Sequence, residues 1–135
     1  MVGAEYGSDR GGDGFEMKAR VFEKLLRRKE DGGCMVRGLR SSSSAAMNMA
    51  LVATVSLDLY WEDGGRWAWD VCAGWCILME AGGLMVACEK QQWKVEVDGR
   101  RYMAVRPAKG WEGQRELVEE MWNIIEDCKS EKRPK

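Results

Sequence analysis

The sequence predicts a layered α/β domain in which helices cover most of a sheet. Segments with the apolar spacing of a helix alternate along the chain with short segments rich in β-branched or aromatic residues, which is typical of this class. The length of 135 residues is that of one domain. A composition of 45% hydrophobic and 32% charged residues is that of a globular protein.

The expected elements follow from periodicity, turn residues and caps. After a glycine- and aspartate-rich loop, Asp13 is the expected N-cap of the first helix, and Ser41 to Ser44 offer caps for the second. The pair Asp98-Gly99 predicts a hairpin turn. In order, we expect a helix over 15–29, a strand over 34–39, a helix over 45–54, a strand over 57–62, a helix over 71–81, strands over 84–87, 94–97 and 102–105, and a helix over 111–128.

The helix over residues 71–81 has the most distinctive pattern. It is apolar almost all round except at Glu80, which predicts burial on most of its sides. Gly74 within it predicts close packing against a neighbouring element. Asp70, just before it, is the expected N-cap.

The composition excludes several kinds of chemistry. There is no histidine, so histidine acid/base catalysis, zinc ligation by histidine and Ser-His or Cys-His nucleophiles are all absent. The net charge of −1 predicts neither a nucleic acid nor an anionic membrane as partner. The longest strongly apolar stretch, residues 71–79, is too short to span a bilayer.

Cysteine and tryptophan usage adds two expectations. An odd number of cysteines, five, without a CxxC pair or a secretory leader predicts free thiols and a cytoplasmic location. Cys72 and Cys76 share a helix face but lack further zinc ligands of suitable spacing, which favours two core side chains. The seven tryptophans are dispersed, so most are expected in the core.

Four polar residues are candidates for a binding or metal site, each with a simpler structural alternative. Asp70 offers a rigid carboxylate suited to Mg²⁺, or it only caps a helix. Glu62 ends a strand, where side chains reach the cleft at a sheet edge, or it is a solvated carboxylate. Ser43 and Ser44 present hydroxyl and N–H groups to a polar ligand, or they only cap the next helix.

Several segments together resemble the inositol monophosphatase family. The segments WDVCAG (residues 69–74) and EAGG (residues 80–83) match the family's second signature, W-D-x-x-A-G…E-A-G-G, with both ends in register. Three further segments agree with the family in order: GSDR, LRSSSSAAMNMALVA and LDLYWE. The stretch AWDVCAGWCILMEAGG is most similar to the branch associated with quinate-utilisation clusters.

The resemblance implies a layered α/β sandwich of the inositol monophosphatase/fructose-bisphosphatase type, represented by its carboxyl-terminal half. That half covers residues 1–128, and a charged tail follows at 129–135. The family's G-E-x-E and D-P-[IL]-D-G-T signatures do not occur in this sequence. In the family those segments supply most ligands of the first metal and the threonine of the catalytic dyad, so no catalytic residue is assigned here.

The resemblance also implies roles for six residues. Asp70 would bind the second Mg²⁺, and Glu62 would accept a hydrogen bond from a substrate hydroxyl. The residues expected to lie beside the substrate are Ser8, Ser43, Ser44 and Ala45. The sequence departs from the family at Ser43, where glycine is usual, and in the loop over residues 63–69, which is one residue longer.

The implied function is a Mg²⁺-dependent phosphomonoesterase that acts on a small phosphorylated polyol such as inositol monophosphate. The alternative is a catalytically inactive half-domain that serves as an interaction module. In either case we expect an open apolar face that favours a homodimer or pairing with an amino-terminal half. Neither nucleic acid nor membrane is an expected partner.

Overall fold

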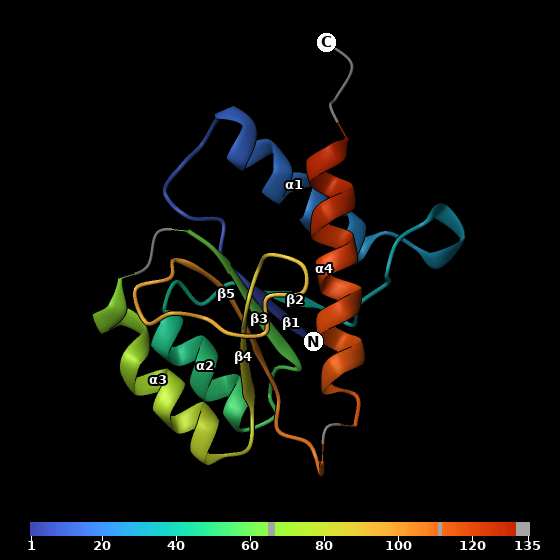
Figure 1. Ribbon diagram of the computed structural model, residues 1–135. Coiled ribbons are helices and arrows are strands. Elements are labelled where there is room, and N and C mark those ends of the chain that lie inside the picture. Colours follow the sequence, from blue (N-terminus) through green and yellow to red (C-terminus); the bar gives the residue numbers. More distant parts are fainter. Residues whose placement is uncertain (65–66, 111, 132–135) are drawn as a thin grey trace.

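The computed structural model describes residues 1–64, 67–110 and 112–131. They form a sheet between two layers of helices (Figure 1), which confirms the predicted α/β class. The strands are β1 (Val2–Ala4), β2 (Leu39–Arg40), β3 (Leu59–Asp63), β4 (Leu84–Ala87) and β5 (Arg101–Val105). The helices are α1 (Gly12–Leu26), α2 (Ala45–Ala53), α3 (Ala68–Glu80) and α4 (Gln114–Ser130).

The sheet is mixed, with strand order β2-β1-β3-β5-β4. β1 runs parallel to both β2 and β3, whereas β5 runs antiparallel to β3 and β4. Successive side chains of a strand point to opposite faces. Leu59 and Trp61 of β3 therefore belong to one core cluster, and Tyr60 between them belongs to the other.

One face of the sheet is covered by α1 and α4, which lie side by side in Figure 1. α1 contributes an apolar stripe in which Met17, Val21 and Leu25 are buried, and α4 contributes a second one. Trp122 of α4 is buried, and its Nε1 donates a hydrogen bond to the carbonyl oxygen of Ala87 at 2.8 Å. The aromatic anchor of this layer therefore also satisfies its polar atom.

The other face is covered by α2 and α3. The predicted close approach at Gly74 is confirmed, because a Cβ built there would lie 2.9 Å from Cβ of Met49 in α2. Ser44 is the N-cap of α2, and its Oγ accepts a hydrogen bond from the Met47 N–H. A glycine on one helix thus allows the two helices to pack tightly together.

The side of α3 away from α2 contradicts the prediction that this helix is buried on most sides. Its inward residues Val71, Gly74 and Leu78 are buried, whereas Ile77 is 52% exposed. Cys72 and Cys76 are also exposed rather than in the core. We call the exposed stripe the outer face of α3; it consists of Trp69, Cys72, Ala73, Cys76, Ile77 and Glu80.

The tryptophan prediction is correct for Trp61 and Trp122 and wrong at the start of α3. Trp61 and Trp122 are buried, but Trp67 and Trp69 are exposed. The rings of Trp67 and Trp69 stack at 5.3 Å, and the Arg100 guanidinium lies 4.3 Å from the Trp67 ring centroid.

The predicted strand over residues 94–97 is not formed, and Asp98-Gly99 is not a hairpin between paired strands. The turn itself exists, since the Gly99 N–H donates to the Glu96 carbonyl oxygen at 2.8 Å. However, β5 has β3 on one side and β4 on the other. No edge of β5 is left for a further strand to pair with.

The amino-terminal strands also differ from expectation. β1 lies in a glycine-containing segment that was not expected to form a strand. The expected strand over 34–39 is reduced to β2, because three of its N–H groups instead donate to carbonyls at the end of α1 or just beyond it: Cys34 to Lys24, Met35 to Arg27 and Val36 to Leu25. This segment thus satisfies carbonyl groups at the end of α1 rather than extending the sheet.

The helix ends shift by a few residues from the predicted ones. The N-cap of α1 is Gly11, and Asp13 lies in the first turn instead of capping it. The expected start of the last helix, residue 111, lies outside the described residues, as do residues 132–135 of the charged tail. The described part of α4 runs from Gln114 to Ser130. Within the ranges described, no helix has the length and apolarity needed to cross a membrane.

Candidate functional site

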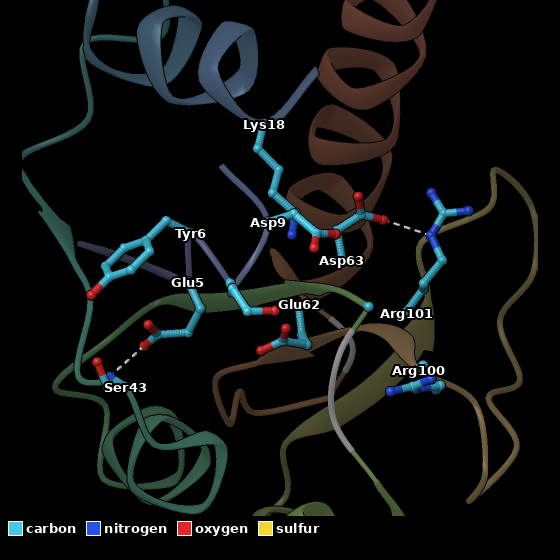
Figure 2. Close-up of a pocket in the computed structure, with 12 residues that line it drawn as sticks. Glu5, Tyr6, Asp9, Lys18, Ser43, Glu62, Asp63, Arg100 and Arg101 are labelled. Carbon is cyan, nitrogen blue, oxygen red and sulfur yellow. Dashed lines mark hydrogen bonds and ion pairs between the residues drawn. The ribbon is translucent and has the colours of Figure 1, made fainter. Parts of the chain in front are cut away.

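A cavity of about 750 Å³ opens at the end of the sheet where the parallel strands β1 and β3 finish. Ligands of open α/β sheets commonly bind at the carboxyl ends of such strands. Two segments supply most of its lining: the loop after β1 and the end of β3 with the residues that follow. The lining residues, several of which Figure 2 shows, are Glu5, Tyr6, Gly7, Ser8, Asp9, Lys18, Ser43, Glu62, Asp63, Gly64, Arg100 and Arg101.

Glu62 lies at the centre of this pocket (Figure 2) and is only 1% exposed. It is therefore not the solvated strand-end carboxylate of the simpler interpretation. β3 fixes its backbone, and the hydroxyl of Tyr60 donates a hydrogen bond to its Oε2. A buried carboxylate costs free energy unless it is hydrogen-bonded. The sheet therefore holds a carboxylate in one defined orientation toward the cavity.

A second buried carboxylate, Glu5, follows β1 directly. Its oxygens accept four hydrogen bonds, at 2.6 to 2.9 Å, from Ser41 Oγ, the Ser42 and Ser43 N–H groups and Asn48 Nδ2. Burial alone would raise the pKa of Glu5, but these hydrogen bonds outweigh burial and lower the pKa below its ordinary value. Glu5 thus fixes the loop before α2 as an anion.

That loop presents Ser43 to the pocket. Ser43 has φ +61°, in the left-handed region that glycine adopts without strain. The backbone at this position therefore has the shape expected of the glycine usual in the resembled family, although the residue is serine. The Ser43 N–H is directed to Glu5 (Figure 2), so the bond to Glu5 supports an otherwise unfavourable conformation.

Asp63 and Arg101 form the opposite wall. Arg101 Nε lies 2.5 Å from Asp63 Oδ1, and Arg101 Nη1 lies 3.1 Å from Glu89 Oε1. Burial opposes the charge of Arg101, yet the bond to Asp63 and the two carboxylates raise the pKa of Arg101 above its ordinary value. The positive charge of Arg101 on this wall is therefore balanced by the carboxylates of Asp63 and Glu89.

The structure brings together three of the six residues that the sequence singled out. Ser8, Ser43 and Glu62 line the pocket. Ser44 and Ala45 do not line it. Ser44 caps α2, and Ala45, the first residue of α2, is buried in the core. Asp70 also lies outside the lining.

Asp70 is part of the start of α3, although it is not the N-cap that the sequence predicted. The N-cap is Trp67, and Asp70 lies in the first turn. Its Oδ2 accepts a hydrogen bond from the Trp67 N–H at 2.9 Å, and its own N–H donates to the Trp67 carbonyl oxygen at 2.9 Å. One carboxylate oxygen is thus engaged in capping the helix.

The donor set for a metal ion is incomplete within the described residues. Among the residues that the structure describes, no three Cys, Asp or Glu side chains are grouped closely enough to hold a cation. Mg²⁺ requires near-octahedral oxygen coordination and is held weakly by a single protein carboxylate. Asp70 and its described surroundings therefore do not form a complete Mg²⁺ site.

Several pocket residues were not found from the sequence. Glu5 follows a strand that was not predicted, and Lys18 lies outside the segments that resemble the family. Asp63 and Arg101 are paired across β3 and β5, which requires knowledge of the strand order. One signal was available for Glu5: a carboxylate directly after an apolar triplet, Val2–Ala4, is typical of a strand end.

Comparison with known proteins gives the context of this pocket. A family model described as the inositol monophosphatase family matches residues 3–126. Inositol monophosphatase 2 of Saccharomyces cerevisiae is 45% identical over 125 residues, which are 90% of this chain and 41% of that protein. The protein qutG of Emericella nidulans is 42% identical over 105 residues, 69% of this chain and 32% of that protein.

Solved structures agree in fold. An inositol monophosphatase from Anabaena superposes with a TM-score of 0.61 at 20% identity, over 93% of this chain and 42% of that one. This likeness shows the fold alone. The chain spans about two-fifths of the length of the two inositol monophosphatases of S. cerevisiae that it matches. The family match and the yeast relatives together establish that the chain belongs to the inositol monophosphatase family.

Proposed function

We propose that the chain forms the substrate-binding side of a metal-dependent phosphomonoesterase that acts on a small phosphorylated polyol such as inositol monophosphate. Residues 1–128 act as the carboxyl-terminal half of the catalytic domain. The observation that carries this proposal is Glu62, a buried carboxylate oriented by Tyr60 within a pocket that also contains Ser8 and Ser43. Family membership supports the reaction class.

The chemistry of the pocket suits a polyol. A carboxylate accepts hydrogen bonds, and the hydroxyl groups of a polyol donate them, so Glu62 selects a hydroxyl neighbouring the phosphate ester. The hydroxyls of Ser8 and Ser43 both donate and accept, which suits the remaining polyol oxygens. Glu5 keeps the Ser43 backbone in place, so it acts on the substrate only through that loop.

Asp70 is the residue we propose as a ligand of the metal, with Mg²⁺ as the ion. A hard carboxylate oxygen at the start of a helix suits Mg²⁺, and further ligands come from the part of the relatives that this chain does not match. When bound, such an ion supplies a more acidic water and neutralises charge on the leaving oxygen. Asp70 contributes one negative charge at a position that the first turn of α3 fixes.

The outer face of α3 supports pairing with the part of the relatives that this chain does not match. It combines exposed apolar side chains at helical spacing, and Met47 of α2 is likewise exposed. Exposed apolar patches of this kind mark interaction surfaces. We propose the amino-terminal half of the family domain as the occupant, since relatives are more than twice as long as the matched region. Self-association as a homodimer is the competing occupant.

A non-catalytic interaction module is the second candidate function. The incomplete donor set among the described residues and the apolar outer face of α3 both favour it. The two candidates share the same surface and differ in whether the paired protein hydrolyses a phosphate ester.

One experiment separates the two candidates. The chain is co-expressed with the unmatched amino-terminal part of the S. cerevisiae relative, and phosphate release from inositol monophosphate is measured with and without Mg²⁺. We expect hydrolysis by the pair that depends on Mg²⁺, and none by the chain alone. A stable pair without hydrolysis supports the interaction module and contradicts the proposed phosphatase.

The role of Glu62 is tested in the same active pair. Glu62→Gln should reduce turnover of inositol monophosphate more than turnover of a phosphate ester without neighbouring hydroxyls. The difference should be about 1–3 kcal/mol in transition-state stabilisation, the usual cost of an unmatched polar contact. Equal losses on the two substrates would assign Glu62 a structural role.

A further inference from the structure

Lys18 has a largely buried side chain that belongs to the pocket but to none of the interactions described so far. It lies on α1, is 9% exposed, and Figure 2 shows its side chain extending from that helix into the cavity. Within the described residues no hydrogen bond or ion pair reaches its ammonium group. The ammonium group is not among the buried polar atoms that lack a partner, so it is the buried stem of Lys18 that directs this charge into the cavity.

The loop after β1 leaves room for this ammonium group. Gly7 has φ +73°, and a Cβ built on it would lie 3.0 Å from Lys18 Nζ. Arg10 fixes the loop, since its Nη1 donates to the Gly7 carbonyl oxygen at 2.5 Å while its guanidinium lies over the Tyr6 ring. The space for Lys18 is thus built into the backbone rather than left by a movable side chain.

The carboxylates of the pocket already have other partners. Glu5 accepts its four hydrogen bonds from the loop before α2, Asp63 pairs with Arg101, and Glu62 accepts from Tyr60. Asp9 is exposed and makes no ion pair with Lys18. Within the part of the pocket that the structure describes, Lys18 therefore carries a positive charge that a ligand can neutralise without breaking an internal bond of these groups.

We propose that Lys18 binds an oxyanion in this pocket, either the phosphoryl group of the substrate or inorganic phosphate. The proposal rests on the proposed function for the identity of the anion. Lysine is a compact point charge with three N–H donors, which suits phosphate oxygens approaching from several directions. A charge-assisted hydrogen bond in a partly dehydrated site is stronger than its equivalent in water.

The test measures binding rather than catalysis. The 135-residue chain is titrated with inorganic phosphate, inositol monophosphate and inositol, followed by calorimetry. Lys18→Met should weaken binding of both phosphates about tenfold, the scale of one charged hydrogen bond, and leave inositol unaffected. Lys18→Arg, which keeps the charge, should retain most of the affinity.

A matched control is available on the same helix. Lys24 pairs with Asp127 at 2.7 Å and lies outside this pocket. Lys24→Met should therefore leave phosphate binding unchanged. Lys18→Met should melt close to the wild-type temperature, because methionine keeps a long buried side chain and the ammonium group that it replaces makes no bond within the described residues. Lys18→Gln serves as a second neutral variant if the methionine variant aggregates.

Two outcomes would overturn the proposal: equal phosphate affinity in folded Lys18→Met and wild type, or no phosphate binding by the folded wild-type chain. Its failure is distinguishable from that of the proposed function. If the pair of halves hydrolyses the ester and Lys18→Met leaves its KM unchanged, only the role of Lys18 is contradicted. If phosphate binding depends on Lys18 but the pair does not hydrolyse the ester, only the proposed phosphatase is contradicted.

Discussion

The two faces of the sheet carry helices of different character. On one face, α1 and α4 direct apolar stripes inward and charged residues outward, and Lys24 of α1 pairs with Asp127 of α4 at 2.7 Å. That hydrogen bond raises the pKa of Lys24. On the other face, α2 and α3 are apolar on the inner side and also expose apolar residues such as Met47 and Ile77. The helices on the first face present charged residues to solvent. Those on the second face also expose apolar residues, as helices of an interior layer would.

The largest expected difference between the faces concerns their tryptophans. Trp122→Ala should destabilise the chain by about 3–5 kcal/mol, because it opens a cavity and removes the hydrogen bond to Ala87. Trp69→Ala, on the outer face of α3, should change stability by less than about 0.5 kcal/mol, because Trp69 is 74% exposed. Urea unfolding followed by circular dichroism measures both, and similar losses would contradict the comparison.

A smaller effect is expected where α2 and α3 meet. Gly74→Ala should cost about 1–3 kcal/mol through overpacking, since the added Cβ meets the Met49 Cβ at 2.9 Å. Gly14 in α1 is the matched control, because a Cβ there meets nothing within 4 Å. Gly14→Ala should be neutral or stabilising by about 0.5–1 kcal/mol. A neutral Gly74→Ala would mean that the two helices pack more loosely than described.

The outer face of α3 should affect association and not folding. Ile77→Glu should leave the free energy of unfolding within about 0.5 kcal/mol of wild type, because the side chain is half exposed. It should weaken pairing with the amino-terminal half, or self-association, about tenfold, since a charge would be buried in an apolar contact. Sedimentation velocity measures association, and unchanged sedimentation of Ile77→Glu would show that this face is not covered.

The smallest effect is expected from Glu5, on the side of α2. Its folded pKa is lowered, so ionised Glu5 adds stability that is present above its ordinary value of 4.5 and is lost as the pH falls through the folded pKa. Glu5→Gln should cost about 1 kcal/mol at neutral pH, and this difference should shrink in acid. Thermal unfolding between pH 7 and pH 3 checks it, and parallel curves for the two proteins would contradict it.

Local patterns allowed most helices to be predicted, because their apolar spacing is a property of a few consecutive turns. The outer face of α3 was mispredicted for the same reason: periodicity reports that a helix is apolar all round, and not which side is covered within this chain. The strand over 94–97 failed because pairing is decided by distant strands. β1 was missed since three residues including Gly3 carry too little pattern.

The candidate site was predictable only where the family pattern reached it. Glu62 and Ser43 stand in recognisable motifs, and the structure places both in the pocket. Lys18 lies outside the segments that resemble the family. It stands among the apolar positions of α1, whose buried residues are Met17, Lys18, Val21 and Leu25, so the helical spacing was the one signal for its burial.

The position of β5 between β3 and β4 has a consequence for folding. β4 joins the sheet only through β5, since it pairs with no other strand of the described sheet. During synthesis, β4 cannot pair with the sheet until residues 101–105 have emerged. Placing β5 between β3 and β4 closes a long loop of chain, and this non-local step slows folding. A chain that stops at residue 100 would thus lack two strands of its sheet rather than one.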